Sequence, residues 1–261
     1  NGWSPRFYQE PLWCHMHNGG KRANVAWHRR AGKDDLGLHY TACAAHERIG
    51  VYWHLLPEAT QARKAIWEAV NPHTGKRRID EAFPPEIRET TRENEMFIKF
   101  KIGSTWQVVG SDHFNSLVGT PPIGIIFSEW SLSNPYSWSY LRPILAENGG
   151  WAIFIWTPRG RNHATEMFDA AVGDPSWFTQ KLTVDDTDVF SKEILDQDGL
   201  DWSEMLPHGP ITYEHPFTAL SLVGHTTSIE VVQKGDGKGT RIEGVLYLHD
   251  ALGLDLYKKA V

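Results

Sequence analysis

The sequence predicts an α/β fold in which a mostly parallel sheet is flanked by helices, and two observations support this prediction. Short apolar runs alternate with helix-like segments, which is typical of parallel βαβ units. One of these runs, 23–27, leads through a turn ending in Gly32-Lys33 into a helix expected over 34–47. A strand, a Gly-Lys turn and a helix form the arrangement that cradles phosphates, so the fold is expected to be that of a P-loop NTPase.

The elements follow one another with lengths that suit such a sheet. The run at 123–127 has the length and β-branched content of a buried parallel strand, and W-A-I-F-I-W is another short apolar run. Two segments joined by Ile102-Gly103-Ser104 predict a hairpin that adds antiparallel strands at an edge. In chain order we expect strand 23–27, helix 34–47, strand 51–55, helix 58–69, hairpin strands 96–101 and 105–109, strand 123–128, helix 138–146, strand 151–156 and helix 164–172.

The character of the chain changes after residue 175. Prolines punctuate a polar region that we interpret as a linker, and from Thr218 onward strand-like segments are separated by glycine turns. These later strands are expected at 219–223, 228–233 and 241–248. The predicted organisation is a P-loop domain over 1–175, a linker over 176–217 and a small β-rich segment over 218–261.

Composition places the chain among ordinary globular proteins. Hydrophobic residues make up 41% and charged residues 22% of its 261 residues. No apolar run approaches the length of a membrane span, and the two cysteines suggest no disulfide framework. The net charge of −6 argues against a protein that coats DNA statically, but it is compatible with a motor that grips DNA through a local patch and releases it.

The turn before the first helix matches the generic phosphate-loop pattern G-x-x-x-x-G-K-[ST] only in part. Gly32 and Lys33 are kept, whereas Trp27 replaces the first glycine and Asp34 replaces the hydroxyl residue that would bind Mg²⁺. Gly-Lys pairs are common in surface turns, so this segment alone favours an ordinary turn. Its interpretation depends on what the other strands carry.

Polar residues follow two of the other predicted strands. Glu129 stands at the carboxyl end of the run at 123–127, where open α/β sheets place their sites and where a carboxylate can orient water against a γ-phosphate. Ser128 occupies the position where an aspartate is usual, and its hydroxyl can hold a metal-bound water. The run T-P-R-G-R-N at 157–162 is placed to sense a phosphate. The ordinary alternatives are a strand-end carboxylate in solvent and a solvated turn.

Taken in order, these motifs resemble one family, the large terminase subunit of tailed bacteriophages, the motor that packages DNA into the capsid. R-F-Y-Q-E-P-L-W resembles its adenine-sensing segment, with Gln9 as the glutamine, and H-R-R-A-G-K-D at 28–34 resembles its deviant phosphate loop. I-I-F-S-E-W at 125–130 resembles its Walker B strand with the catalytic glutamate, and 157–163 resembles its coupling motif. Several motifs in one order are more specific than any one of them.

The resemblance covers about residues 5–190 and implies the additional-strand, catalytic-glutamate type of P-loop NTPase. It also implies a division of roles, in which Lys33 neutralises the β- and γ-phosphates of ATP and Glu129 orients the attacking water. Positive charge in the transition state would come from Arg29 or Arg30. The residues implied to contact the nucleotide are Gln9, His28, Ala31, Gly32, Asp34, Thr157 and Arg159, and those implied to hold Mg²⁺ are Ser128 and Asp34.

The function implied by the resemblance is an ATP-hydrolysing motor that drives double-stranded viral DNA into a procapsid. Its implied partners are DNA, the small terminase subunit and the portal protein, and its implied form is a homo-oligomeric ring in the bacterial host cytoplasm, with no membrane. Candidates for gripping DNA are Arg159, Arg161 and the basic run at 76–78. For the run at 76–78, a solvated charge cluster is the preferred interpretation.

The C-terminal segment weakly resembles the opening of the family's ribonuclease-H-like nuclease domain. Ser221 stands where the first catalytic aspartate is expected, and the sequence ends at Val261 before such a domain could close. Asp250 and Asp255 are too few carboxylates to hold two metals, so we predict no nuclease activity. A small β appendage over 200–261, unrelated to a nuclease, is an open alternative.

Two other functions stay open at this point. The departures at Trp27, Asp34 and Ser128 motivate a terminase-like module that binds nucleotide or an assembly partner without turnover. A metal-dependent nuclease that uses acidic residues of the C-terminal half is less favoured, because Ser221 and the early end of the sequence argue against it.

Overall fold

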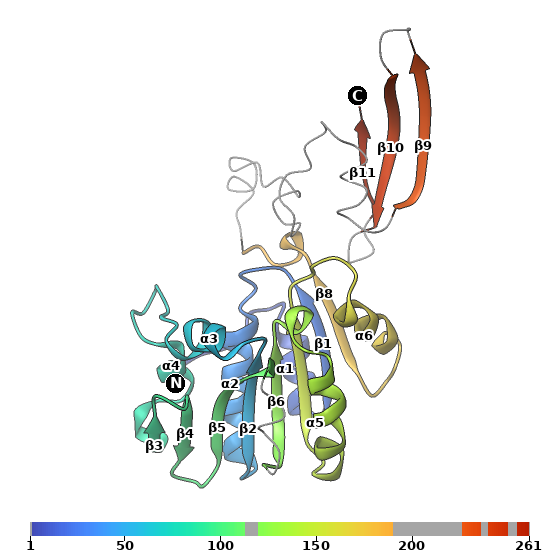
Figure 1. The fold of residues 1–261 in the computed structure, drawn as a ribbon. Helices are drawn as coiled ribbons and strands as arrows, with labels where there is room; N and C mark the ends of the chain where they lie inside the picture. The colour runs from blue at the N-terminus through green and yellow to red at the C-terminus, as the bar shows by residue number, and fades with distance from the viewer. Residues whose placement is uncertain (1, 113–119, 190–225, 236–239, 250–254, 261) are drawn as a thin grey trace. The chain divides into compact units, whose positions relative to one another are not determined.

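The computed structural model describes residues 2–112, 120–189, 226–235, 240–249 and 255–260 (Figure 1). The chain divides into two compact units, which are described separately below. The first consists of Asn1–Thr157 with Met167–Val189, and the second consists of Pro158–Glu166 with Phe190–Val261.

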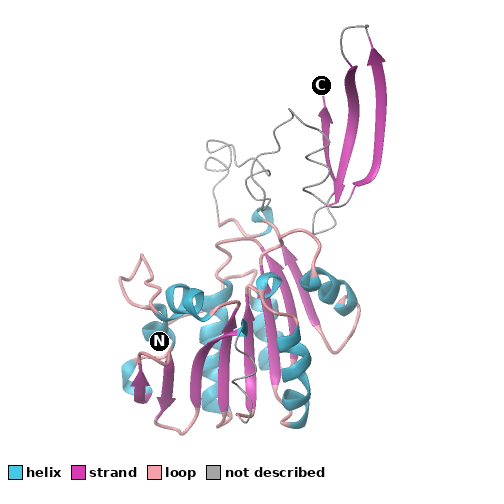
Figure 2. Ribbon diagram, viewed as in Figure 1, coloured by secondary structure: helices cyan, strands magenta, loops and turns pink. Residues whose placement is uncertain are grey.

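The first unit is built on an eight-stranded sheet with helices on both faces (Figure 2). In chain order its strands are β1 (Arg22–Trp27), β2 (Val51–Leu56), β3 (Arg88–Arg92), β4 (Phe97–Phe100), β5 (Thr105–Gly110), β6 (Pro122–Ser128), β7 (Trp151–Trp156) and β8 (Phe178–Leu182). Across the sheet the order is β3-β4-β5-β2-β6-β7-β1-β8. The neighbours from β5 to β8 are all parallel, and only the β3–β4 and β4–β5 pairs are antiparallel. The predicted mostly parallel α/β sheet is confirmed.

The centre of this sheet explains the apolar runs in the sequence. All seven residues of β6 are buried, and so are five of the six residues of both β1 and β7. Strands covered on both faces need continuous apolar sequence rather than alternation. Strand β7 lies between β1 and β6, so an additional strand separates the strand that precedes the Gly-Lys turn from the strand that ends at Ser128. This is the predicted fold class.

Six α-helices accompany the strands of the described chain: α1 (Glu10–His17), α2 (Lys33–Glu47), α3 (Ala59–Ala62), α4 (Arg78–Ala82), α5 (Tyr136–Glu147) and α6 (His163–Ala171). Helices α2 and α5 cover opposite faces of the sheet (Figure 1). A Cβ atom built on Gly37 of α2 would lie 3.3 Å from the Ile126 side chain, whereas Trp138 of α5 packs edge-on against Phe127. Because Ile126 and Phe127 are consecutive in a strand, they point to opposite faces.

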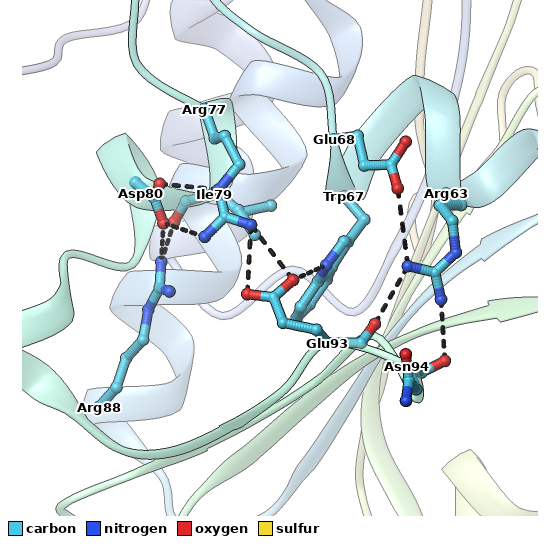
Figure 3. A network of polar contacts seen from close by, with 9 residues as sticks. All are labelled: Arg63, Trp67, Glu68, Arg77, Ile79, Asp80, Arg88, Glu93 and Asn94. Carbon is cyan, nitrogen blue, oxygen red and sulfur yellow. Dashed lines mark hydrogen bonds and ion pairs between the residues drawn. The ribbon is translucent and has the colours of Figure 1, made fainter.

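A network of charged residues fastens the antiparallel edge to the helices beside it (Figure 3). The guanidinium of Arg77 donates to Asp80 at 2.9 Å and to Glu93 at 3.2 Å, and Arg88 donates to the same Asp80 at 2.6 Å. Glu93 also accepts from the indole of Trp67 at 2.6 Å. The Arg77 guanidinium is therefore paired with carboxylates of the same unit.

The neighbouring arginine of the basic run at 76–78 is occupied as well. Arg78 forms an ion pair with Asp35 at 3.5 Å. With Arg77 and Arg78 both paired, the preferred interpretation of this run as a charge cluster, rather than a DNA grip, gains support. The partners are carboxylates of the same unit, which the sequence did not identify.

Several elements differ from the expectations. Strands β3 and β8 were not predicted, because R-E-T-T-R and F-T-Q-K-L are edge strands that contain no continuous apolar run. Strand β8 pairs with β1 and carries the sheet past residue 175, the expected domain end. The helix expected over 58–69 forms only α3 and a π-helical turn (Arg63–Trp67), which lets the fully buried Trp67 stack on Trp106.

The second unit contains a three-stranded antiparallel sheet made of β9 (Thr226–Gly235), β10 (Thr240–His249) and β11 (Asp255–Ala260). Two of these strands match the segments predicted at 228–233 and 241–248, so the β-rich character is confirmed. The strand predicted at 219–223, Ser221, Asp250 and the part of the expected linker from residue 190 onward lie outside the described residues.

Among the described helices, none combines the length and the apolar character that crossing a membrane requires.

Candidate nucleotide-binding and hydrolysis site

The loop from His28 to Gly32, here called the β1–α2 loop, lies at the carboxyl end of β1 and leads into α2. Gly32 is the residue before the helix and has a φ of 70°, and Arg30 has a φ of 68°. The backbone angle favours glycine at this position, and a Cβ atom on Gly32 would stand 2.9 Å from Nε2 of Gln9 and displace that amide. Among the described residues, no side chain caps α2, which leaves its first N–H groups free for an anion.

The ammonium group of Lys33 is folded back over this loop. Its Nζ donates to the carbonyl oxygens of His28 at 3.0 Å and Trp27 at 3.3 Å and to Oγ1 of Thr157 at 3.0 Å. Only 7% of Lys33 is exposed. Burial lowers the pKa of Lys33, and the nearby carboxylates of Glu129 and Asp34 oppose that shift. A cation held beside an uncapped helix N-terminus is well placed to exchange these oxygens for those of a phosphate.

Asp34 and Ser128 form a direct pair across the site. The hydroxyl of Ser128, the last residue of β6, donates to Oδ1 of Asp34 at 2.7 Å. The same Oδ1 lies 3.1 Å from Nε2 of His54, which is fully buried in β2. Burial would raise the pKa of Asp34, but the hydrogen bonds from His54 and Ser128 and the charge of Lys33 hold it below its ordinary value. Asp34 is therefore a carboxylate at neutral pH.

Glu129 follows β6 in a backbone conformation that is unusual for a glutamate. Its φ of 49° and ψ of 44° lie in the left-handed region, which costs a non-glycine residue about 1–2 kcal/mol. The strain persists because the turn behind it is fixed: the backbone oxygen of Glu129 accepts from the N–H of Leu132 at 2.8 Å. Strained residues of this kind concentrate at functional sites.

Thr157 connects the ends of three neighbouring strands. Its hydroxyl accepts from Lys33, whose Nζ also contacts the end of β1 at the Trp27 oxygen, and its backbone oxygen accepts at 3.1 Å from the hydroxyl of Ser131, which lies just after β6. Thr157 itself follows β7 and is the last residue of the first unit before Pro158. The predicted coupling segment is thus divided: Thr157 belongs to the first unit and Arg159 to the second. A role for Arg159 at the phosphates stays a prediction.

Gln9 contacts the β1–α2 loop directly. Its Nε2 donates to the carbonyl oxygens of Ala31 at 2.8 Å and Gly32 at 3.2 Å, and its Oε1 accepts from the backbone N–H of Arg6 at 3.0 Å. Tyr8 adds a bond from its hydroxyl to the Ala31 oxygen at 3.3 Å. In this structure the amide of Gln9 braces the loop, and its role in sensing adenine stays a prediction.

The other predicted residues of the loop point in different directions. The ring of His28 lies 2.8 Å from Oγ1 of Thr187, and its backbone N–H donates to Leu182 at 3.1 Å, which continues the pairing of β1 with β8. Burial lowers the pKa of His28. Arg29 and Arg30 are both exposed. A residue that contacts a nucleotide or a neighbouring subunit has to be exposed.

The side chains available to bind a metal come from two elements, α2 and β6. In the described part of the chain, no group of three or more His, Cys, Asp or Glu side chains could hold a metal ion by itself. Mg²⁺ commonly takes one or two protein ligands and completes its shell with phosphates and water. The Asp34 carboxylate and the Ser128 hydroxyl fit a metal that arrives with a nucleotide.

Sequence reasoning missed His54 and Ser131. His54 is the one basic residue in the apolar run V-Y-W-H-L-L of β2, and it is fully buried; a residue that can carry charge in such a strand is a signal that a partner exists. The sequence could not identify Asp34 as that partner. Ser131 carried no signal that distinguished it from an ordinary turn serine.

Comparisons with known proteins place this fold in a class. No protein-family model matches the sequence, and no curated protein matches it. Solved structures do match. The fold is similar to that of large terminases, including a terminase ATPase domain, which confirms the resemblance predicted from the motifs.

Two structures illustrate the likeness. The ATPase domain of the large terminase of Thermus phage P74-26 is 20% identical, with a TM-score of 0.53, over 69% of this chain and 81% of that chain. The large terminase of a thermophilic bacteriophage is 13% identical, with a TM-score of 0.59, over 94% of this chain. This chain spans 65% of the length of that second protein. Crystals of the same protein also contain ADP or ATP-gamma-S.

Proposed function

We propose that this chain is the ATP-hydrolysing subunit of a motor that drives double-stranded viral DNA into a procapsid. The observation that carries the proposal is the link from Lys33 through Thr157 to Ser131, which joins the carboxyl ends of β1, β7 and β6 in one site. Carboxyl ends of parallel strands are where α/β proteins bind ligands. The likeness to large terminase ATPase domains supports the same function.

In the proposed reaction, the backbone of Ala31, Gly32 and Lys33 cradles the phosphates, and the ammonium of Lys33 moves from Thr157 to the β- and γ-phosphates. Glu129 orients the water that attacks the γ-phosphorus, and ADP leaves with the bridging oxygen. Arg29 or Arg30 stabilises the charge that builds up on the transferring group. Asp34 and Ser128 would hold magnesium, which would supply charge neutralisation at the phosphate oxygens.

The movement of Lys33 provides a route from hydrolysis to motion. Thr157 loses its bond from Lys33 when the phosphates arrive, and Thr157 directly precedes the segment that begins at Pro158 in the second unit. Arg159 then senses the γ-phosphate. The partners of such a motor would be DNA, the small terminase subunit and the portal protein, and a ring of identical subunits on the procapsid in the host cytoplasm would complete the assembly.

The test is to measure ATP binding and phosphate release side by side in two variants. Lys33→Ala is expected to lose both, whereas Glu129→Gln is expected to bind ATP and lose about a hundredfold or more of turnover. Matched controls are the exposed Lys101→Ala and Glu147→Gln, which should behave as wild type. Unchanged turnover in Glu129→Gln would contradict the proposal.

A second candidate is a module of the same fold that binds nucleotide or an assembly partner without turning it over. The observation that favours it is the departure from the generic pattern at Trp27, Asp34 and Ser128. Tight ATP binding without phosphate release, in the presence of DNA and partner proteins, would support this module instead. A metal-dependent nuclease is the least favoured candidate, and it would require plasmid cleavage that survives Lys33→Ala.

A further inference from the structure

The pair formed by Asp34 and Ser128 is the reverse of the usual one. In the generic phosphate-loop ATPase, the helix after the Gly-Lys turn supplies a hydroxyl to Mg²⁺ and the neighbouring strand supplies an aspartate. Here the helix carries the carboxylate and the strand carries the hydroxyl. The two groups still touch, because the Ser128 hydroxyl donates to Asp34 Oδ1 at 2.7 Å. Each departure compensates for the other.

Packing of α2 on the sheet explains why these two positions meet. Residues 126 and 128 of β6 point to the same face, since side chains alternate along a strand. Gly37 of α2 lies against Ile126, and the absence of a side chain on Gly37 allows this close approach. Asp34 is three residues earlier, on the same side of the helix, so it lies over Ser128. The pairing is therefore a consequence of the fold.

His54 joins this pair from the adjacent strand. It is opposite Ile126 in the β2–β6 register and thus points to the α2 face. Its Nε2 lies 3.1 Å from Asp34 Oδ1, and its buried Nδ1 has no hydrogen-bond partner among the described residues. A proton on Nε2 satisfies this geometry, because a proton on Nδ1 would be buried without an acceptor.

The two donors leave one oxygen of Asp34 uncommitted. Both hydrogen bonds end on Oδ1, so within the described residues Oδ2 accepts none. The Asp34 side chain is 25% exposed. The Ser128 oxygen also keeps lone pairs while its proton points at Asp34. Two adjacent oxygens, Oδ2 of Asp34 and Oγ of Ser128, therefore keep acceptor capacity in the site.

We infer that the Mg²⁺ site of this chain is built with its two side chains exchanged, the carboxylate on α2 and the hydroxyl on β6, and that His54 is the positioning residue that orients the carboxylate. The inference rests on the proposed function. A carboxylate on a helix is held less rigidly than one on a central strand. The hydrogen bond from His54, added to the one from Ser128, fixes the plane of the Asp34 carboxylate. Mutating a residue that hydrogen-bonds to a metal ligand commonly lowers the metal affinity by about 10- to 100-fold.

The sharpest test restores the generic arrangement. Asp34→Thr, Ser128→Asp and the double variant are compared by titrating a fluorescent ATP analogue in excess Mg²⁺ and in EDTA. Asp34→Thr leaves no carboxylate and Ser128→Asp places two carboxylates in contact, so each is expected to lose about tenfold or more of the Mg²⁺-dependent gain in affinity. The double variant is expected to regain most of this gain. A double variant no better than the worse single variant overturns the inference.

His54 is tested by two replacements with the same readout. His54→Phe removes the donor, and it is expected to reduce the Mg²⁺-dependent gain about tenfold while leaving affinity in EDTA unchanged. His54→Gln keeps an N–H donor and should recover part of that loss. A merely structural role would lower affinity equally in Mg²⁺ and in EDTA, and that result would exclude His54 as a positioning residue.

The same titration separates the failure of this inference from failure of the proposed function. Wild-type protein and Glu129→Gln serve as references, and both should bind the analogue more tightly with Mg²⁺. If the wild type binds no nucleotide under either condition, the proposed function is wrong and the inference falls with it. If the wild type binds with a Mg²⁺-dependent gain but the exchanged pair does not recover it, only the inference is wrong.

Discussion

The Nζ atom of Lys33 donates a 3.0 Å hydrogen bond to Oγ1 of Thr157, a residue 124 positions further along the chain. This bond joins the start of α2 to the end of β7, and through the Thr157 carbonyl it reaches Ser131 after β6. In the account proposed above, an arriving phosphate takes the lysine away from Thr157. The bond is thus present only when the site holds no nucleotide.

Removing the Thr157 hydroxyl should therefore make nucleotide binding easier. Thr157→Val keeps the shape of the side chain but leaves Lys33 with two protein acceptors in place of three. A typical hydrogen bond contributes about 0.5–1.5 kcal/mol, so ADP affinity is expected to rise about two- to tenfold. Calorimetric titration with ADP measures this change, and Thr157→Ser is the control. Weaker ADP binding by Thr157→Val would contradict the account.

Gln9 should be needed for the stability of the β1–α2 loop before any nucleotide arrives. Gln9→Ala removes the donors to Ala31 and Gly32, and Gln9→Glu places a buried carboxylate against the same two carbonyl oxygens. We expect a loss of about 1–3 kcal/mol in the free energy of unfolding for Gln9→Ala and a larger loss for Gln9→Glu. Urea denaturation of the nucleotide-free protein measures both.

The two roles of Gln9 separate when ATP and GTP are compared. If Gln9 acts only as a brace, Gln9→Ala lowers affinity for ATP and GTP by the same factor. If it also reads adenine, as the resemblance implies, the variant loses affinity for ATP alone. Equal stability of the wild type and Gln9→Glu would argue against the brace.

The left-handed backbone conformation of Glu129 should lower the stability of the folded protein. Glycine adopts left-handed backbone angles without strain, so Glu129→Gly is expected to be more stable than Glu129→Ala by about 1–2 kcal/mol. Both variants lack the carboxylate, and both should be inactive. Chemical denaturation compares the two, with Glu147→Ala and Glu147→Gly in α5 as the matched pair, for which glycine should be the less stable. Equal stabilities at residue 129 would argue against backbone strain there.

The stability of the first unit should depend on pH through His39. Burial lowers the pKa of His39 from 6.5 to about 4, although the charge of Glu81 opposes the shift. The unfolded chain takes up a proton below pH 6.5 and the folded chain does so only near pH 4, so the contribution is complete above pH 6.5 and is lost as the pH falls between these values. The expected slope is at most about 1.4 kcal/mol per pH unit.

The measurement is denaturant unfolding at several pH values for the wild type and His39→Gln. The variant should lack this slope, while the exposed His46→Gln should keep it. A slope that survives in His39→Gln would assign the pH dependence to other groups.

Sequence alone predicted the centre of the fold better than its edges. Strands β1, β6 and β7 are buried on both faces, so their sequences are continuous apolar runs that match the expected bounds to within a residue. Strands β3 and β8 lie at the two edges of the sheet and have largely polar sequences, so nothing local distinguishes them from loops. Their positions are set by pairing with strands that are distant in the sequence, and a local sequence pattern holds no information about that pairing.

The same distinction holds for the candidate site. That Lys33 and Thr157 would meet could be predicted, since each follows a central strand and parallel strand ends share one edge of a sheet. The contact of His54 with Asp34 could not, because it depends on how α2 lies across β2 and β6. The bonds of Gln9 to the loop likewise depend on where the segment before α1 docks.

The most direct test of the central claim is phosphate release by Glu129→Gln at saturating ATP and Mg²⁺, with and without duplex DNA, relative to the wild type. The account predicts a loss of about a hundredfold or more in turnover while ATP remains bound, because Glu129 orients the attacking water. Turnover equal to that of the wild type would contradict the account and remove Glu129 from the chemistry.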